Sequence, residues 1–232
     1  MTLNYTEACE QVDRLLTAYP KLNVVESDSN RIRLCGSIEV YRSAYDYTLQ
    51  KEYPIEIIIP LGNDEMPAII ETNSLIDSDY PHRYKNGSLC LETNTAIRMR
   101  FIEGFDLIAW MDEFVEPYFF SYEYYTRYGS FPFGERPHGL SGIVHTYQEI
   151  FHTDDPGKAC ALLLYAAEEV YRGHAPCPCG SGEKIRKCHG QYLYPFMMDP
   201  RKKAIALSDL QYLRRELNSY EQSGRNTAKT KR

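Results

Sequence analysis

The sequence lacks the features that mark membrane, secreted and repeat proteins. No run of about 18 apolar residues occurs, so no membrane-spanning helix is expected. The stretch MTLNYTEACEQVDRLL at the start has no apolar signal-peptide core, and neither an internal repeat nor a low-complexity segment follows it. We therefore expect a cytoplasmic protein that does not bind a membrane.

The composition of the chain is that of an ordinary globular protein. Its 232 residues are 43% hydrophobic and 25% charged. This length supports one domain with a sizeable core, or one domain with a small second module.

The charge is unevenly spread along the chain. Residues 171–232 carry 13 Lys and Arg against 5 Asp and Glu, whereas the preceding 170 residues carry 13 against 27. The break falls near the stretch YRGHAPCPCGSG, where we place a module boundary. The basic part can meet an acidic protein or nucleic acid, but the acidic body argues against nucleic-acid binding by the whole protein.

Hydrophobic periodicity predicts an α+β fold. The first helix is expected within residues 5–20, where apolar side chains recur at helical spacing through Tyr19 and Pro20 helps to end the helix. Extended segments follow at 22–26, 31–42, 53–61 and 67–73, and further helices at 105–129, 143–151, 154–172 and 199–222. Pro117 should kink or divide the first of these later helices. Consecutive strands with short connections predict a four-stranded antiparallel meander with a helix on one face.

The seven cysteines fall into three groups. We interpret Cys9, Cys35 and Cys160 as packing residues, because each lies on an apolar face of an expected helix or strand. Three others, Cys177, Cys179 and Cys188, lie close together in the basic part, and Cys90 stands alone in an expected loop. A chain without a signal peptide is expected to keep its cysteines as thiols or metal ligands.

The stretch APCPCGSGEKIRKCHG indicates a metal site. Cys177, Cys179, Cys188 and His189 offer three thiolates and one imidazole, which suit tetrahedral Zn²⁺. Because protein residues fill all four positions, the zinc should be structural. A disulfide or a redox pair fits poorly with the adjacent histidine. The stretch resembles the SEC-C zinc motif, with Lys184 at the position of the motif's lysine.

The basic side chains beside these ligands are open to two interpretations. Lys184, Arg186 and Lys187 can form a docking patch, since SEC-C motifs serve mostly as small interaction modules. They can equally be a solvated basic face.

The stretch YPHRYKNGSLCL contains a candidate nucleophile, Cys90. A nucleophilic cysteine needs access, a thiolate fraction and donors for the oxyanion that it creates. Asn86, Gly87 and Ser88 supply a polar turn directly before Cys90. The alternative is a buried packing cysteine.

The order of elements and this stretch together resemble the ubiquitin-conjugating family over roughly residues 1–150. In that family, a His-Pro-Asn signature precedes the catalytic cysteine. Here Pro81 matches the signature proline, Gly87 matches a glycine three residues before the cysteine, and Leu91 matches the apolar residue that follows Cys90. The resemblance implies that Cys90 carries an acyl group as a thioester.

Two positions depart from the family's signature. Tyr80 replaces its histidine and His82 replaces its asparagine. A histidine at position 82 can keep a hydrogen-bond donor role, act as a base or only brace the loop. His138, in the stretch FGERPHGLSG, matches a segment of bacterial defence-associated members of this fold, which would place it near Cys90; the alternative is that it only belongs to a capping loop. The implied catalytic residues are therefore Cys90, His82 and His138.

The resemblance implies a specific function. Stand-alone proteins of this architecture resemble those encoded beside cGAS-like nucleotidyltransferases in short type II CBASS anti-phage operons, so the carried group would be that partner's C-terminus, passed on to an amine. No glycine-rich nucleotide-binding loop is present, which leaves activation of the carboxyl group to another protein. The alternative is a catalytically dead binding module that docks through its zinc knuckle.

These predictions divide the chain into four parts. They are a ubiquitin-conjugating-like domain over 1–150, a linking helix over 151–173, a zinc module with a terminal helix over 174–222, and a disordered basic tail over 223–232.

Overall fold

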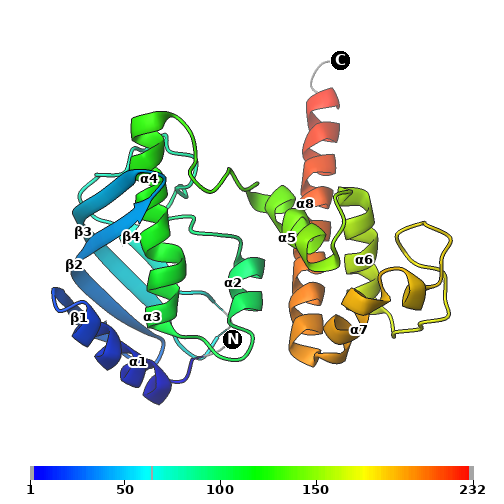
Figure 1. Ribbon diagram of the computed structural model, residues 1–232, viewed down its shortest axis with the longest axis horizontal. Coiled ribbons are helices and arrows are strands. Elements are labelled where there is room, and N and C mark those ends of the chain that lie inside the picture. The colour runs from blue at the N-terminus through cyan, green and yellow to red at the C-terminus, as the bar shows by residue number, and fades with distance from the viewer. Residues whose placement is uncertain (1–2, 64, 230–232) are drawn as a thin grey trace. The chain divides into compact units, whose positions relative to one another are not determined.

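The computed structural model describes residues 3–63 and 65–229. The chain divides into two compact units, both drawn in Figure 1. The first unit contains Met1–Asn94 and Phe101–Glu135, and the second contains Thr95–Arg100 and Arg136–Arg232.

The first unit has an N-terminal helix and a four-stranded antiparallel sheet, as predicted (Figure 1). Its elements begin with α1 (Tyr5–Ala18), β1 (Leu22–Ser27), β2 (Arg31–Ala44), β3 (Tyr47–Pro60) and β4 (Ala68–Glu71). The strands pair in sequence order, β1-β2-β3-β4. The expected meander and the α+β class are therefore confirmed.

Alternating side chains give the sheet one apolar face. The residues buried on this face include Ile32, Leu34, Ile38 and Val40 of β2, and Tyr53, Ile55, Ile57 and Ile59 of β3. Successive side chains of a strand point to opposite faces, so every second residue can join the core. Helix α4 contacts β2 and β3.

Gly36 lets two backbones approach closely within the sheet. It pairs with Leu22 of β1 and has a φ of +150°. A Cβ atom at this position would lie 2.1 Å from the carbonyl oxygen of Lys21. Only glycine avoids that overlap at the start of β1.

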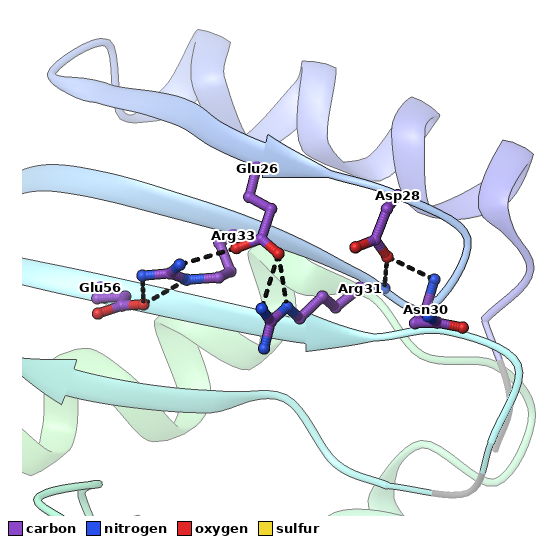
Figure 2. Close-up of polar contacts among 6 residues, drawn as sticks. All are labelled: Glu26, Asp28, Asn30, Arg31, Arg33 and Glu56. Atoms are coloured by element: carbon purple, nitrogen blue, oxygen red, sulfur yellow. Dashed lines mark hydrogen bonds and ion pairs between the residues drawn. The ribbon is translucent and has the colours of Figure 1, made fainter.

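Charged side chains link the first three strands (Figure 2). Glu26 of β1 accepts hydrogen bonds from Arg31 at 2.7 Å and from Arg33 at 2.8 Å. Arg33 also contacts Glu56 of β3 at 2.6 Å. Hydrogen bonds from Arg33 and Arg31 hold the pKa of the Glu26 carboxyl below its usual value. Because β1 is an edge strand, these charges oppose pairing with a strand of another molecule.

One long helical run follows in the first unit. It consists of α3 (Leu107–Trp110), the π-helical segment η1 (Met111–Val115) and α4 (Glu116–Tyr128). Pro117, where a division was predicted, lies in the first turn of α4. Because proline has no N–H for the carbonyl four residues earlier, the ordinary helical ladder is interrupted here, and the π-helical turn directly precedes it. The run ends at Gly129, whose φ is +69°.

The second unit is a helical assembly. Its elements are α2 (Asn94–Arg100), α5 (Gly139–Phe151), α6 (Pro156–Glu168), the 3-10 helix η2 (Ile185–Lys187), α7 (Gly190–Met198) and α8 (Pro200–Lys229). Helix α6 begins as predicted, with Asp155 accepting hydrogen bonds from the backbone of Gly157 and Lys158, and with proline at the first helical position. Helices α5, α6 and α7 contact one another, and α8 contacts α6 and α7.

The unit boundary differs from the predicted domain boundary. Residues 136–150, assigned above to the first domain, lie in the second unit. The physical reason is aromatic packing, since Tyr147 and Phe151 of α5 pack against Phe196 of α7. Helix α6, predicted as a linker, is a central helix of this unit, with Leu162 and Leu163 buried in its core.

The C-terminal helix is longer than predicted. Helix α8 continues through Lys229, so residues 223–229 of the expected disordered tail are helical, and residues 230–232 lie outside the described part of the chain. The stretch contains no proline to end a helix. Within residues 3–63 and 65–229, no helix combines the length and apolar composition needed to cross a bilayer.

Candidate functional site

The stretch before Cys90 folds into a small hairpin. The N–H of Tyr84 donates to the carbonyl of Ser88 at 2.8 Å, and the N–H of Gly87 donates to the carbonyl of Tyr84 at 2.9 Å. The N–H of Cys90 donates to the carbonyl of His82 at 2.8 Å. Gly87 has a φ of +88°, and three-residue hairpin loops commonly place a glycine in this conformation.

The sheet holds this hairpin in place. The N–H of Leu89 donates to the carbonyl of Ile69 in β4 at 2.9 Å, and Ser88 forms a bridge with Ile70. Ser88 and Leu89 are buried. The backbone of the Cys90 segment is therefore fixed to the edge of the sheet.

Hairpin pairing brings three polar side chains together. His82 lies directly opposite Cys90, and residues opposite each other in an antiparallel pair project to the same side. A ring nitrogen of His82 lies within 4.8 Å of the Cys90 sulfur. Tyr84 is the diagonal neighbour of Cys90, and its hydroxyl lies 3.3 Å from the sulfur.

Aromatic side chains surround His82. The imidazole packs against Tyr80, with ring centroids 5.4 Å apart, and against Phe131, with centroids 5.1 Å apart. The hydroxyl of Tyr118 in α4 donates to the backbone carbonyl of His82 at 3.1 Å. The orientation of His82 is thus restricted on several sides.

Tyr80, at the position of the family's signature histidine, is a core residue. It is buried and packs edge-on against Tyr118 and Tyr122 of α4. Burial raises the pKa of its hydroxyl above the usual value. Its role here is packing beneath the hairpin.

Two opposing influences act on the Cys90 thiol. Burial raises its pKa, and the negative charge of Glu92 raises it further. The hydrogen bond with Tyr84 lowers it. Because the half-buried thiol remains partly accessible, the side chain can meet an electrophile, but the thiolate fraction at neutral pH depends on its hydrogen-bond partners.

His138 belongs to the second unit and is the residue before the first turn of α5. Its carbonyl accepts hydrogen bonds from the Ser141 hydroxyl at 2.8 Å and from the N–H of Gly142 at 3.3 Å. His138 is therefore the N-cap residue of α5. Its approach to Cys90 stays a prediction.

The four predicted metal ligands converge in the second unit. The ligand atoms of Cys177, Cys179, Cys188 and His189 all lie within 4.8 Å of one another. The sulfur atoms of Cys179 and Cys188 are 3.6 Å apart, and the Cys177 sulfur lies 3.4 Å from Nδ1 of His189. Ligands placed tetrahedrally at about 2.3 Å from a zinc ion lie about 3.8 Å from each other. The cluster can therefore hold a metal ion.

Backbone turns bring the two halves of this cluster together. Pro176 pairs with Lys184, and the N–H of Cys177 donates to the carbonyl of Glu183 at 2.7 Å. Gly180 and Gly182 take φ values of +80° and +79° in the intervening turn. These conformations favour glycine, which explains the sequence GSG between the ligand pairs.

The remaining cysteines differ in exposure. Cys9 and Cys35 are half-buried, in keeping with partial packing, but Cys160 is exposed on α6. The interpretation of Cys160 as a packing residue is therefore wrong. The apolar character of α6 extends around more of the helix than its buried side, and Leu164 is likewise exposed.

Sequence reasoning did not identify Tyr84. The signal that could have found it is the Asn-Gly pair at residues 86 and 87, which favours a hairpin and thereby sets the residues opposite and diagonal to Cys90. No protein-family model matches the chain, and no solved structure matches it significantly.

Proposed function

We propose that this protein is a ubiquitin-conjugating-like acyl carrier, which holds the C-terminal carboxyl group of a partner protein as a thioester on Cys90 and passes it to an amine. The observation that carries the proposal is the hairpin that sets the His82 imidazole against the Cys90 sulfur at the edge of the sheet. The order of helix, antiparallel meander and long helix supports it, because it agrees with the fold of that family.

The proposed chemistry is acyl transfer in two steps. The Cys90 thiolate attacks the carbonyl carbon of an activated carboxyl group, supplied as an acyl adenylate or as a thioester on another protein. The carbon–sulfur bond forms, and the leaving group departs with its electron pair. An amine then attacks the same carbon and loses a proton to a base, and the Cys90 thiolate leaves.

Histidines supply the groups that the second step needs. His82 can donate a hydrogen bond to the oxyanion or accept the proton of the amine, because its ring nitrogen lies near the sulfur. We propose His138 as the second such group. In keeping with the resemblance to proteins of short type II CBASS operons, the carried group is the C-terminus of a cGAS-like nucleotidyltransferase.

The metal cluster has a structural role in this proposal. Three thiolates and one imidazole are a typical set for Zn²⁺, and no position is left for a substrate. The ion would hold the segment between α6 and α7 in place. Lys184, Arg186 and Lys187 are exposed and lie between the ligand pairs in the sequence, and they would serve as a docking patch for an acidic protein surface.

A binding module without catalysis is the second candidate. It is favoured by the burial and the negative charge that raise the pKa of the Cys90 thiol, and by the use of Tyr80 as a packing residue. In that case, the hairpin would only complete the edge of the sheet.

The mass of the protein purified together with the proteins encoded beside it tests the proposal. We expect an added mass that equals a partner polypeptide and that mild hydroxylamine removes, because hydroxylamine cleaves thioesters. The unmodified mass under all conditions, including in the presence of ATP and the neighbouring proteins, would favour the binding module.

A further inference from the structure

Tyr84 occupies a defined place beside the sulfur of Cys90. Its N–H bonds to Ser88 and its carbonyl bonds to Gly87, so its backbone is fixed on both sides of the hairpin turn. From this position, its hydroxyl reaches across the diagonal of the hairpin to within 3.3 Å of the Cys90 sulfur. Long side chains span diagonal neighbours in antiparallel pairs, so the contact follows from the register.

The direction of this hydrogen bond depends on the state of the thiol. A neutral thiol can donate its proton to the tyrosine oxygen. A thiolate has no proton to donate, whereas the phenol O–H can donate to it, and hydrogen bonds to an ionised acceptor are about twice as strong as neutral ones. The contact therefore stabilises the thiolate more than the thiol.

The His82 imidazole lies within 4.8 Å of the sulfur and, when protonated, also favours the thiolate. Glu92, Tyr118 and Arg83 do not supply this stabilisation. Glu92 carries a negative charge that opposes ionisation of the thiol, as does burial. Burial above all, and then the neighbouring Tyr80 and Cys90, raise the pKa of the Tyr118 hydroxyl, which donates to the backbone carbonyl of His82. Arg83 directs its guanidinium to the carbonyl of Ile76 at 3.0 Å.

We propose that Tyr84 is a functional residue of the Cys90 site, whose hydroxyl donates to the sulfur and holds it as a thiolate for attack on an acyl group. The inference rests on the proposed acyl-transfer function. Once the carbon–sulfur bond has formed, the sulfur is uncharged, so the hydrogen bond weakens. It strengthens again when the thiolate leaves in the transfer step, so that Tyr84 also favours departure of the sulfur.

The pH dependence of Cys90 alkylation by iodoacetamide tests this inference. The rate is followed by mass spectrometry of the peptide that contains Cys90, in wild type and Tyr84→Phe. This substitution keeps the ring and removes the donor. We expect the apparent pKa of Cys90 to rise by about one unit, so that alkylation at pH 7 slows about tenfold. The two rates should converge at high pH, where both thiols are ionised.

A matched control separates the donor from a general effect of losing a tyrosine hydroxyl. Tyr41→Phe, at a position of β2 that is 65% exposed, should leave the profile unchanged. Superimposable profiles of wild type and Tyr84→Phe would overturn the inference, and so would a rate change of equal size at every pH, which indicates altered access. Iodoacetamide reacts whether or not Cys90 ever carries an acyl group, so failure of this inference is distinct from failure of the proposed function.

Discussion

The Thr95 hydroxyl donates a 2.8 Å hydrogen bond to the carboxylate of Asp209, although 114 positions separate the two residues. The Tyr147 hydroxyl donates to the same oxygen at 2.9 Å, and all three side chains are buried. Helix α2, which begins four residues after Cys90, is thereby bonded to α8. The segment that follows Cys90, the candidate nucleophile, therefore enters the second unit, which contains the metal cluster.

Asp209 should make the stability of the second unit depend on pH. Burial raises its pKa, against hydrogen bonds from Thr95 and Tyr147 and the charge of Arg98, which lower it. A carboxyl group whose folded pKa is raised contributes stability that is present below its unfolded pKa and is lost as the pH rises through the folded pKa. Asp209→Asn should therefore gain stability relative to wild type as the pH rises from about 4. Urea unfolding across this range measures the difference, and a difference independent of pH would contradict the assignment.

Loss of a metal ligand should unfold the second unit. We expect one zinc ion per chain by elemental analysis of protein purified without chelator, and its release in Cys177→Ser and in His189→Ala. The cooperative thermal transition of the second unit should then disappear, because Cys177 and Cys179 belong to its hydrophobic core. The first unit should keep its transition, since it contributes no ligand.

Cys160→Ser is the control for the metal prediction. This cysteine is exposed on α6 and lies outside the ligand cluster, so its replacement should change neither the zinc content nor the thermal transitions. Purified protein that contains no metal would refute the zinc assignment. Loss of both transitions in Cys177→Ser would show that the two units unfold together.

Gly36→Ala should destabilise the protein more than Gly62→Ala. At position 62, φ is +71° and open space surrounds the missing side chain, so the cost is that of a left-handed backbone, about 1–2 kcal/mol. At position 36, the new methyl group would also overlap the carbonyl of Lys21 and push β1 from β2, for a loss above about 3 kcal/mol. Chemical denaturation compares the two variants, and equal losses would contradict the close approach of the strands.

His82 and His138 should act after Cys90 has been loaded. In each alanine variant, we expect the thioester to form but to discharge about 100- to 1000-fold more slowly, which corresponds to the loss of about 2.7–4 kcal/mol typical of one oxyanion donor. Discharge to an amine is followed by gel electrophoresis without reductant. His145→Ala, on α5, is the control and should discharge at the wild-type rate. Wild-type discharge in both His82→Ala and His138→Ala would leave these histidines as braces of their loops.

Periodicity suffices to predict the elements that have one clear apolar side. Helix α1, the four strands and α6 are all expected from alternation or helical spacing and from caps such as Asp155. The metal ligands are predictable for another reason. Three cysteines and a histidine at such close spacing fit few functions other than metal binding. All four ligands also lie within a single stretch of sixteen residues, so no distant contact has to be predicted.

Contacts between distant segments are what the sequence could not predict. The assignment of α5 to the second unit depends on Tyr147 meeting Asp209 and Phe151 meeting Phe196, and periodicity does not say which apolar faces meet. Helix α2 has only seven residues and follows a loop, so its pattern is too short to recognise. The hairpin before Cys90 carries little hydrophobic alternation, and its register depends on hydrogen bonds with β4.

The central claim is that Cys90 carries an acyl group, and the masses of three proteins test it most directly. Wild type, Cys90→Ser and Cys90→Ala are each co-expressed with the neighbouring genes and analysed intact, with and without reductant. We predict a partner adduct on wild type that reductant releases, and a slower-forming adduct on Cys90→Ser that resists reductant, because an oxygen ester is a poorer acyl donor than a thioester. Cys90→Ala, which removes the nucleophile with little change in volume, should fold and carry no adduct. The same adduct on Cys90→Ala would contradict the account.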